Sequence, residues 1–125
     1  MQELDVLNSI NKLRKEHHLQ DYKYCSYCAE LAEQHSLNMA NKTVPFSHDG
    51  LNDRINLIKK KCGANFMKCS ENVAYSRPDM NPVEAWKKSQ GHYKNMMGDF
   101  NYCGIGKVQK EKEFYYTAIF LKIKE

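Results

Sequence analysis

The segment YCGIGKVQKEKEFYYTAIFLKI, from Tyr102 to Ile123, decides the fold of this chain. Aromatic and β-branched residues fill its two halves, 102–109 and 114–123, and a charged stretch, Lys110 to Lys112, separates them, which predicts a β-hairpin. One face of the second strand carries Tyr115, Thr117, Ile119, Leu121 and Ile123, and the other carries Phe114, Tyr116, Ala118 and Phe120. Because both faces are apolar, we expect this strand to lie in the middle of a sheet that is covered on both sides.

Upstream of the hairpin, apolar residues recur with the period of amphipathic helices in residues 2–17, 24–41 and 51–61. Gly63 follows the third of these helices and is placed to end it. A fourth helix, 82–89, is predicted to begin at Asn81-Pro82, a capping residue followed by proline, and to end near Gly91. We expect a further short helical turn at 93–97.

Helices packed on both sides of a small antiparallel sheet satisfy this pattern, so the predicted fold class is α+β with three layers. The chain has 125 residues, of which 42% are hydrophobic and 27% charged, as is usual for one globular domain. We therefore expect a single domain that spans residues 1–125. Gly104 and Gly106, in the first strand of the hairpin, are expected to permit close packing against a neighbouring element.

Charge and hydropathy argue against nucleic-acid binding and against a transmembrane segment. The net charge is +4, but the lysines are scattered and the densest run, Lys59 to Lys61, contains no aromatic residues, so nucleic acid is not an expected partner. No stretch approaches the roughly 18 consecutive apolar residues of a membrane span, so no transmembrane segment is predicted.

Cysteine usage indicates an oxidising compartment. The chain has five cysteines, and their spacing completes no zinc finger. The preferred disulfide joins Cys62 and Cys69 across a short loop. Cys25-Ser26-Tyr27-Cys28 fits a redox pair, half of a zinc site, or two small buried residues at a helix start, and the context favours a structural or disulfide role. We therefore expect an extracellular or cell-surface protein, with its export signal or lipid anchor outside this sequence.

Three polar residues are the candidates for a functional site. His48 lies in the polar turn Ser47-His48-Asp49-Gly50, where it can stay accessible, and Glu71 precedes the apolar residues 73–75. His92 follows the predicted 82–89 helix. Two histidines and one carboxylate form a known set of zinc ligands with a fourth position open to water. A purely structural hydrogen-bonding role for Glu71 is equally compatible with its position, which can also raise its pKa or pair it with an imidazole.

Four motifs occur in an order that resembles the CAP superfamily of cysteine-rich secretory, antigen five and pathogenesis-related proteins. They are SHDG at 47–50, ENVAY at 71–75, the string Trp86, Ser89, His92 and Asn95, and CGIG at 103–106. The resemblance, to the compact bacterial branch in particular, implies an α-β-α sandwich in which His48, Glu71, Ser89 and His92 line a cleft. Many members have glutamate at the position of Ser89, so one carboxylate of the family pattern is missing here.

The leading hypothesis from the resemblance is a non-enzymatic exported binding protein, whose partner is a small ligand, a lipid, or a host or surface protein. In family members the cleft can take a divalent ion such as Zn²⁺. The first alternative is therefore a zinc-dependent hydrolase in which His48 and His92 hold the metal and Glu71 is a further ligand or the general base. The second alternative is a carrier of sterols or fatty acids that uses an apolar groove.

Overall fold

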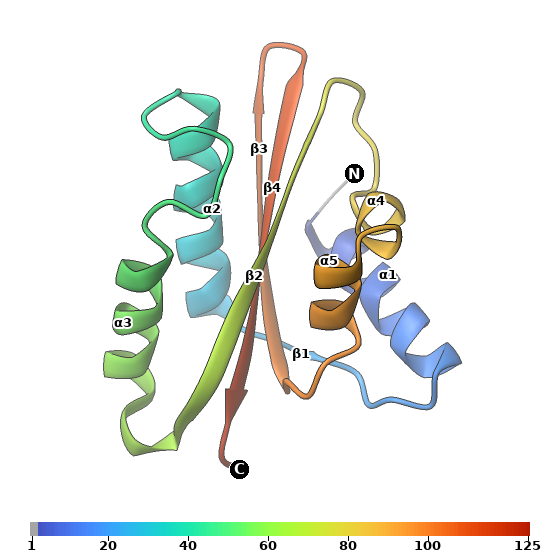
Figure 1. Cartoon of the computed structure of the whole chain (residues 1–125), viewed down its shortest axis with the longest axis vertical. Helices are drawn as coiled ribbons and strands as arrows, with labels where there is room; N and C mark the ends of the chain where they lie inside the picture. Colours follow the sequence, from blue (N-terminus) through green and yellow to red (C-terminus); the bar gives the residue numbers. More distant parts are fainter. Residues whose placement is uncertain (1–2) are drawn as a thin grey trace.

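A computed structural model describes residues 3–125 and has a mixed sheet between two layers of helices (Figure 1). The elements follow the order α1 (Glu3–Glu16), β1 (Lys23–Tyr24), α2 (Ser26–Ala40), α3 (Leu51–Cys62), η1 (Gly63–Asn65), β2 (Phe66–Ser76), α4 (Val83–Lys87), α5 (Gln90–Met96), β3 (Tyr102–Lys110) and β4 (Glu113–Ile123). No helix within residues 3–125 is long and apolar enough to cross a membrane.

The predicted hairpin is confirmed, and β4 is a central strand. The strand order is β1-β3-β4-β2, with β4 antiparallel to both β3 and β2. The sheet is not wholly antiparallel, because the two-residue strand β1 pairs with β3 in parallel. Tyr24, the second residue of β1, was expected to belong to the second helix, which instead begins at Ser26.

The two faces of β4 contact different helices, as the alternation of its residues predicted. The face with Ile119 and Leu121 packs against Cys28, Ala32 and Ile58, from α2 and α3. The opposite face, with Phe114, Tyr116, Ala118 and Phe120, packs against residues of α1, α4 and α5. Figure 1 shows α2 and α3 on one side of the sheet and α1, α4 and α5 on the other.

Gly104 and Gly106 let α2 lie directly against β3, as expected. A Cβ atom at Gly104 would lie 2.3 Å from the backbone nitrogen of Ala29, and one at Gly106 would lie 2.1 Å from that of Glu33. Both neighbours are backbone atoms of α2, so no side-chain rotation could relieve the overlap. The two glycines therefore set the distance between the helix and the sheet.

Strand β2 and the end of α4 differ from the prediction. Residues 66–76 form an edge strand that the sequence did not reveal, because the buried polar residues Glu71 and Asn72 interrupt the apolar alternation. The helix predicted at 82–89 ends at Lys87, since Ser89 has extended backbone angles and begins a new helix. Gly91 consequently lies inside α5 and ends no helix, whereas Gly63 ends α3 as predicted.

Candidate functional site

Glu71 is the centre of the candidate site. It projects from β2 toward the layer of α2 and α3, and its carboxylate is fully buried. Arg54 donates from Nε to Oε2 at 2.7 Å and from Nη2 to Oε1 at 2.8 Å. His48 Nδ1 lies 2.8 Å from Oε1. Arg54 thus donates to both carboxylate oxygens, and His48, from a separate segment, also contacts Oε1. The two parallel bonds from one guanidinium suit a buried carboxylate charge.

Arg54 joins the 41–50 loop to the sheet. Besides Glu71, its guanidinium donates to the backbone carbonyl oxygens of Asp49, at 2.9 Å, and His48, at 3.4 Å. Only 11% of its side chain is exposed. Sequence reasoning did not select Arg54. A signal was present, however, because Arg54 falls three residues after Leu51 and four before Ile58, on the apolar face of its own helix.

His48 is held by Glu71 while part of its ring faces solvent. Its hydrogen bond to the Glu71 carboxylate requires a proton on Nδ1, which leaves Nε2 as an acceptor when the ring is neutral. The side chain is 43% exposed, as expected for a histidine in a polar turn. The structure therefore presents an oriented imidazole at the surface.

His35, on α2, lies beneath His48 and was not among the predicted site residues. It is 1% exposed and therefore lies in the core. Its Nε2 lies 2.7 Å from the carbonyl oxygen of Ser47 and 3.9 Å from Glu71 Oε1. Its Nδ1 has no hydrogen-bond partner within residues 3–125. Burial lowers the pKa of His35, which disfavours the imidazolium form.

His92 approaches from the opposite side of β2. Asn72 Nδ2 donates to the His92 carbonyl oxygen at 3.1 Å, and Asn95 Nδ2 donates to Asn72 Oδ1 at 2.9 Å, so α5 is bonded to the strand. The His92 ring lies beside Trp86, with centroids 6.4 Å apart. Burial and the nearby His48 together lower the pKa of His92. In Figure 1, β2 passes between α3 and α5, so residues of both helices can contact this strand from its two faces.

We refer to His35, His48, Arg54, Glu71 and His92 as the edge-strand site. The fourth predicted residue, Ser89, is half-buried and is the N-cap residue of α5. Its hydroxyl makes no hydrogen bond to His48, Glu71 or His92, and its carbonyl oxygen accepts from Tyr93 N at 2.8 Å. Ser89 therefore shapes the start of the helix that carries His92.

The side chains of this site do not fit a three-ligand zinc centre. Within residues 3–125, no three His, Cys, Asp or Glu side chains are grouped so that they could hold a metal ion. Both oxygens of Glu71 already accept hydrogen bonds, because Arg54 donates to Oε1 and Oε2 and His48 contacts Oε1. A metal at Glu71 would have to compete with the Arg54 ion pair for the predicted carboxylate ligand.

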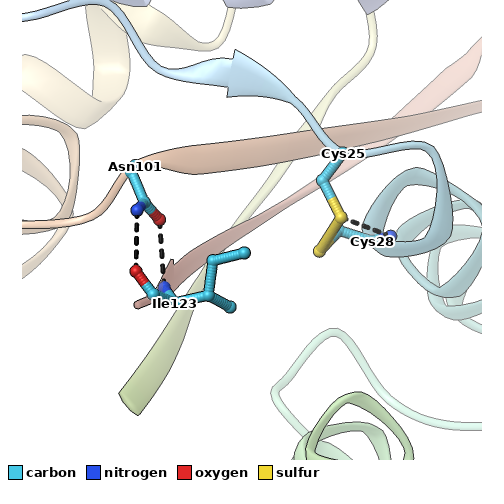
Figure 2. Close-up of a disulfide and its surroundings, with 4 residues drawn as sticks. All are labelled: Cys25, Cys28, Asn101 and Ile123. Carbon is cyan, nitrogen blue, oxygen red and sulfur yellow. Dashed lines mark hydrogen bonds between the residues drawn. A yellow bond between two sulfur atoms is a disulfide. The ribbon is translucent and has the colours of Figure 1, made fainter. Parts of the chain in front are cut away.

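The cysteines pair differently from the prediction. Cys25 and Cys28 form a disulfide, shown in Figure 2, so the disulfide role for this motif is confirmed. Cys62 and Cys69 are free, and the predicted bridge between them is wrong. Cys62 ends α3 and Cys69 lies within β2, and each packs separately against the apolar cluster around Ile58 and Leu121.

The fold and the ordered motifs define a class of protein. Residues 7–120 match CAP, the cysteine-rich secretory protein family, and the chain belongs to that family. The uncharacterized membrane protein YlbC of Bacillus subtilis is 32% identical to this chain, over 96% of this chain and 34% of YlbC.

Solved structures agree with this assignment. An extracellular protein from Bacillus anthracis that contains an SCP domain superposes with a TM-score of 0.79 at 27% identity, over 96% of this chain and 40% of that one. An outer surface protein from Borrelia burgdorferi superposes with a TM-score of 0.78 at 21% identity, over 95% of this chain and 90% of that one, and shows the shared fold alone. This chain thus spans less than half of either Bacillus protein.

Proposed function

We propose that this chain is a non-enzymatic binding domain whose ligand contacts the imidazoles of His48 and His92 at the edge-strand site. The observation that carries the proposal is the double occupation of the Glu71 carboxylate by Arg54 and His48. A carboxylate held in this way orients its neighbours. The exposed ring of His48 is then a fixed contact for a ligand, with little conformational entropy left to lose on binding.

The same contacts count against hydrolysis. A general base must reach a water molecule or substrate proton with a free lone pair. Glu71 is fully buried, and its oxygens accept from Arg54 and His48. Ser89, where many family members carry glutamate, supplies no replacement carboxylate. The zinc-dependent hydrolase is therefore the weaker of the two readings.

The lipid-carrier alternative draws support from one apolar pocket, between the start of α2 and the end of α3. Its volume is about 270 Å³, and its walls include Tyr27, Ile58 and Leu121. Pockets for drug-sized ligands usually enclose about 300–1,000 Å³, so this one suits a short apolar segment better than a whole sterol. We therefore place the binding function at the edge-strand site.

We also propose that the domain acts outside the cell or at its surface. The Cys25–Cys28 disulfide is compatible with an oxidising compartment. The related SCP-domain protein of Bacillus anthracis is described as extracellular, and YlbC is described as a membrane protein. A domain displayed on the outer face of a membrane would agree with both descriptions.

Turnover assays separate binding from catalysis. The purified chain is incubated with chromogenic ester, peptide and phosphodiester substrates, with and without added zinc chloride, beside His48→Ala and His92→Ala variants. We expect all three proteins to remain at the background rate. Turnover well above background in the unmodified chain, lost in both variants, would overturn the proposal.

Binding itself is tested by NMR. The ¹⁵N-labelled chain is titrated with phosphatidylglycerol vesicles, phosphatidylcholine vesicles, myristate, and a panel of soluble glycans. We expect at least one probe to shift the resonances of His48 and His92 and to lose affinity at least tenfold in the His48→Ala, His92→Ala double variant. Shifts confined to residues outside the edge-strand site would contradict the proposed location.

A further inference from the structure

Four of the five cysteines gather in one apolar cluster. Cys28 is buried against Ile58, Ile119 and Leu121, and Cys25, Cys62 and Cys69 pack around the same core. This cluster has no part in the binding function proposed above. It combines one disulfide with two free thiols, a grouping that bears directly on thiol–disulfide chemistry.

The disulfide is asymmetric in its exposure. Cys25 is the N-cap residue of α2 and is half-buried, whereas Cys28 is completely buried in the first turn. The backbone N–H of Cys28 donates to Cys25 Sγ at 3.1 Å, which Figure 2 shows as a dashed line. Once the disulfide opens, a thiolate at Cys25 would be stabilised by this N–H and by the N-terminal end of a 15-residue helix.

Cys25, the more exposed residue of the disulfide, lines a pocket. The cavity of about 270 Å³ is lined by Cys25 and Cys62, by the aromatic rings of Tyr24 and Tyr27, and by Ile58 and Lys61. The ammonium group of Lys61 lies 5.2 Å from the centroid of the Tyr27 ring. An apolar cavity with a disulfide-bonded cysteine in its wall and a cation beside it complements a small thiol that carries a carboxylate.

Two hydrogen bonds hold one wall of the pocket in place. Ile123, which contributes to its wall, is bonded through both backbone groups to the side chain of Asn101, at 2.9 and 3.1 Å (Figure 2). The end of β4 is thereby held beside the disulfide. A docked thiol would meet a fixed wall, which favours a defined angle of approach to the sulfur.

We propose that Cys25–Cys28 is a thiol–disulfide exchange site that accepts electrons from a small carboxylate-bearing thiol bound in this pocket. The ligand thiol ionises and its thiolate attacks Sγ of Cys25, the Cys25–Cys28 bond breaks, and the buried Cys28 leaves as a thiolate that takes up the proton released by the ligand. A second ligand thiolate then attacks the ligand sulfur of the mixed disulfide and releases Cys25 as a thiolate. Two thiols are oxidised to one disulfide, and the protein disulfide is reduced to two thiols.

The two free thiols do not compete in this reaction at neutral pH. Burial raises the pKa of Cys69 to about 11, and burial also raises the pKa of Cys62 although Lys61 opposes it. Only thiolates attack disulfides, so both groups remain largely inactive as protonated thiols. Cys69→Ala is consequently a suitable control, since Cys69 packs on the same apolar cluster but does not line the pocket.

The first test compares the folded and unfolded chain. Oxidised protein is mixed with reduced glutathione at pH 7, alkylated at intervals, and analysed by mass spectrometry of the Cys25 and Cys28 peptides. We expect the folded chain to react at least tenfold faster than the same chain in 8 M urea, and Cys69→Ala to stay within twofold of the unmodified protein. A folded chain that reacts more slowly than the unfolded one would overturn the proposal, because a structural disulfide is protected by folding.

The second test concerns the ligand. Lys61→Gln should slow exchange with glutathione about three- to tenfold and leave the rate with neutral 2-mercaptoethanol within twofold. Equal effects on both thiols would contradict recognition of the carboxylate. In a Cys28→Ala variant, iodoacetamide at pH 6.5 should alkylate Cys25 at least tenfold faster than Cys62, and equal rates would contradict thiolate stabilisation at the helix start. If that variant does not fold, the glutathione rates of the unmodified chain decide the outcome.

Discussion

Arg54 binds both carboxylate oxygens of Glu71, at 2.7 and 2.8 Å, and so joins α3 to the edge strand β2. The same guanidinium reaches the backbone of the 41–50 loop at Asp49. Helix, loop and strand are thus connected through one ion pair, and the exposed His48 is positioned by it. The edge-strand site depends on this contact more than on any other in the described structure.

Glu71→Gln should lower the free energy of unfolding by about 3–5 kcal/mol, because it leaves the Arg54 charge buried without its counter-ion. Urea denaturation at pH 7.5 measures the change. Glu84→Gln is the control, since Glu84 makes an exposed ion pair with Lys87 and its loss should cost less than about 0.5 kcal/mol. A loss below about 1 kcal/mol for Glu71→Gln would show that the pair contributes little.

His92 should titrate below pH 6.5, because burial and His48 both lower its pKa. Histidine ring resonances followed by NMR give this value directly. In His48→Gln the electrostatic contribution disappears while the burial remains, so the pKa of His92 should rise and still stay below 6.5. An unchanged value in that variant would mean that the two rings do not interact.

Stability should fall with acidification through the histidines. Burial lowers the pKa of His35 in the folded chain, so the unfolded chain binds the proton more readily. The free energy of unfolding is therefore greatest above pH 6.5 and decreases as the pH falls through 6.5, by at most about 1.4 kcal/mol per pH unit for this residue. Urea denaturation at pH 7.5 and 5.5 should show a smaller pH difference for His35→Asn than for the unmodified chain. An equal difference in both proteins would assign the effect to other groups.

Gly106→Ala should destabilise the chain by about 3 kcal/mol or more, because the added Cβ would overlap the backbone of α2 at Glu33. Gly91→Ala is the matched control. Gly91 lies within α5 with open space around the new Cβ, so this change should be neutral or stabilising by up to about 1 kcal/mol. Thermal unfolding of both variants tests the pair, and similar losses in the two would exclude a specific contact between α2 and β3.

Much of the fold could be predicted from local patterns. The alternation in residues 114–123 correctly predicted a central strand with helices on both faces, and Gly104 and Gly106 indicated the close packing of α2. Strand β2 escaped detection because its buried residues at 71 and 72 are polar and are satisfied by partners distant in sequence. Hydrophobic periodicity contains no information about such partners.

The sequence predicted only part of the site, because contacts between distant residues do not appear in local patterns. The ordered motifs pointed to His48, Glu71 and His92, and the structure brings their segments together on both sides of β2. Arg54 and His35 were missed because helical periodicity places a residue on a face of its helix and does not show which strand residue it contacts. Pairing of the cysteines depends on tertiary distances, so spacing alone could not show that Cys62 and Cys69 stay unpaired.

We propose that Glu71 orients the His48 ring through a hydrogen bond and acts neither as a general base nor as a metal ligand. The protonation state of the His48 ring tests it most directly, through long-range ¹H–¹⁵N NMR at a pH where the ring is neutral. We predict a proton on Nδ1, donated to Glu71 Oε1, and no change in that pattern when zinc chloride is added. A proton on Nε2 with Nδ1 bare, or displacement of the Nδ1 proton by zinc, would contradict it.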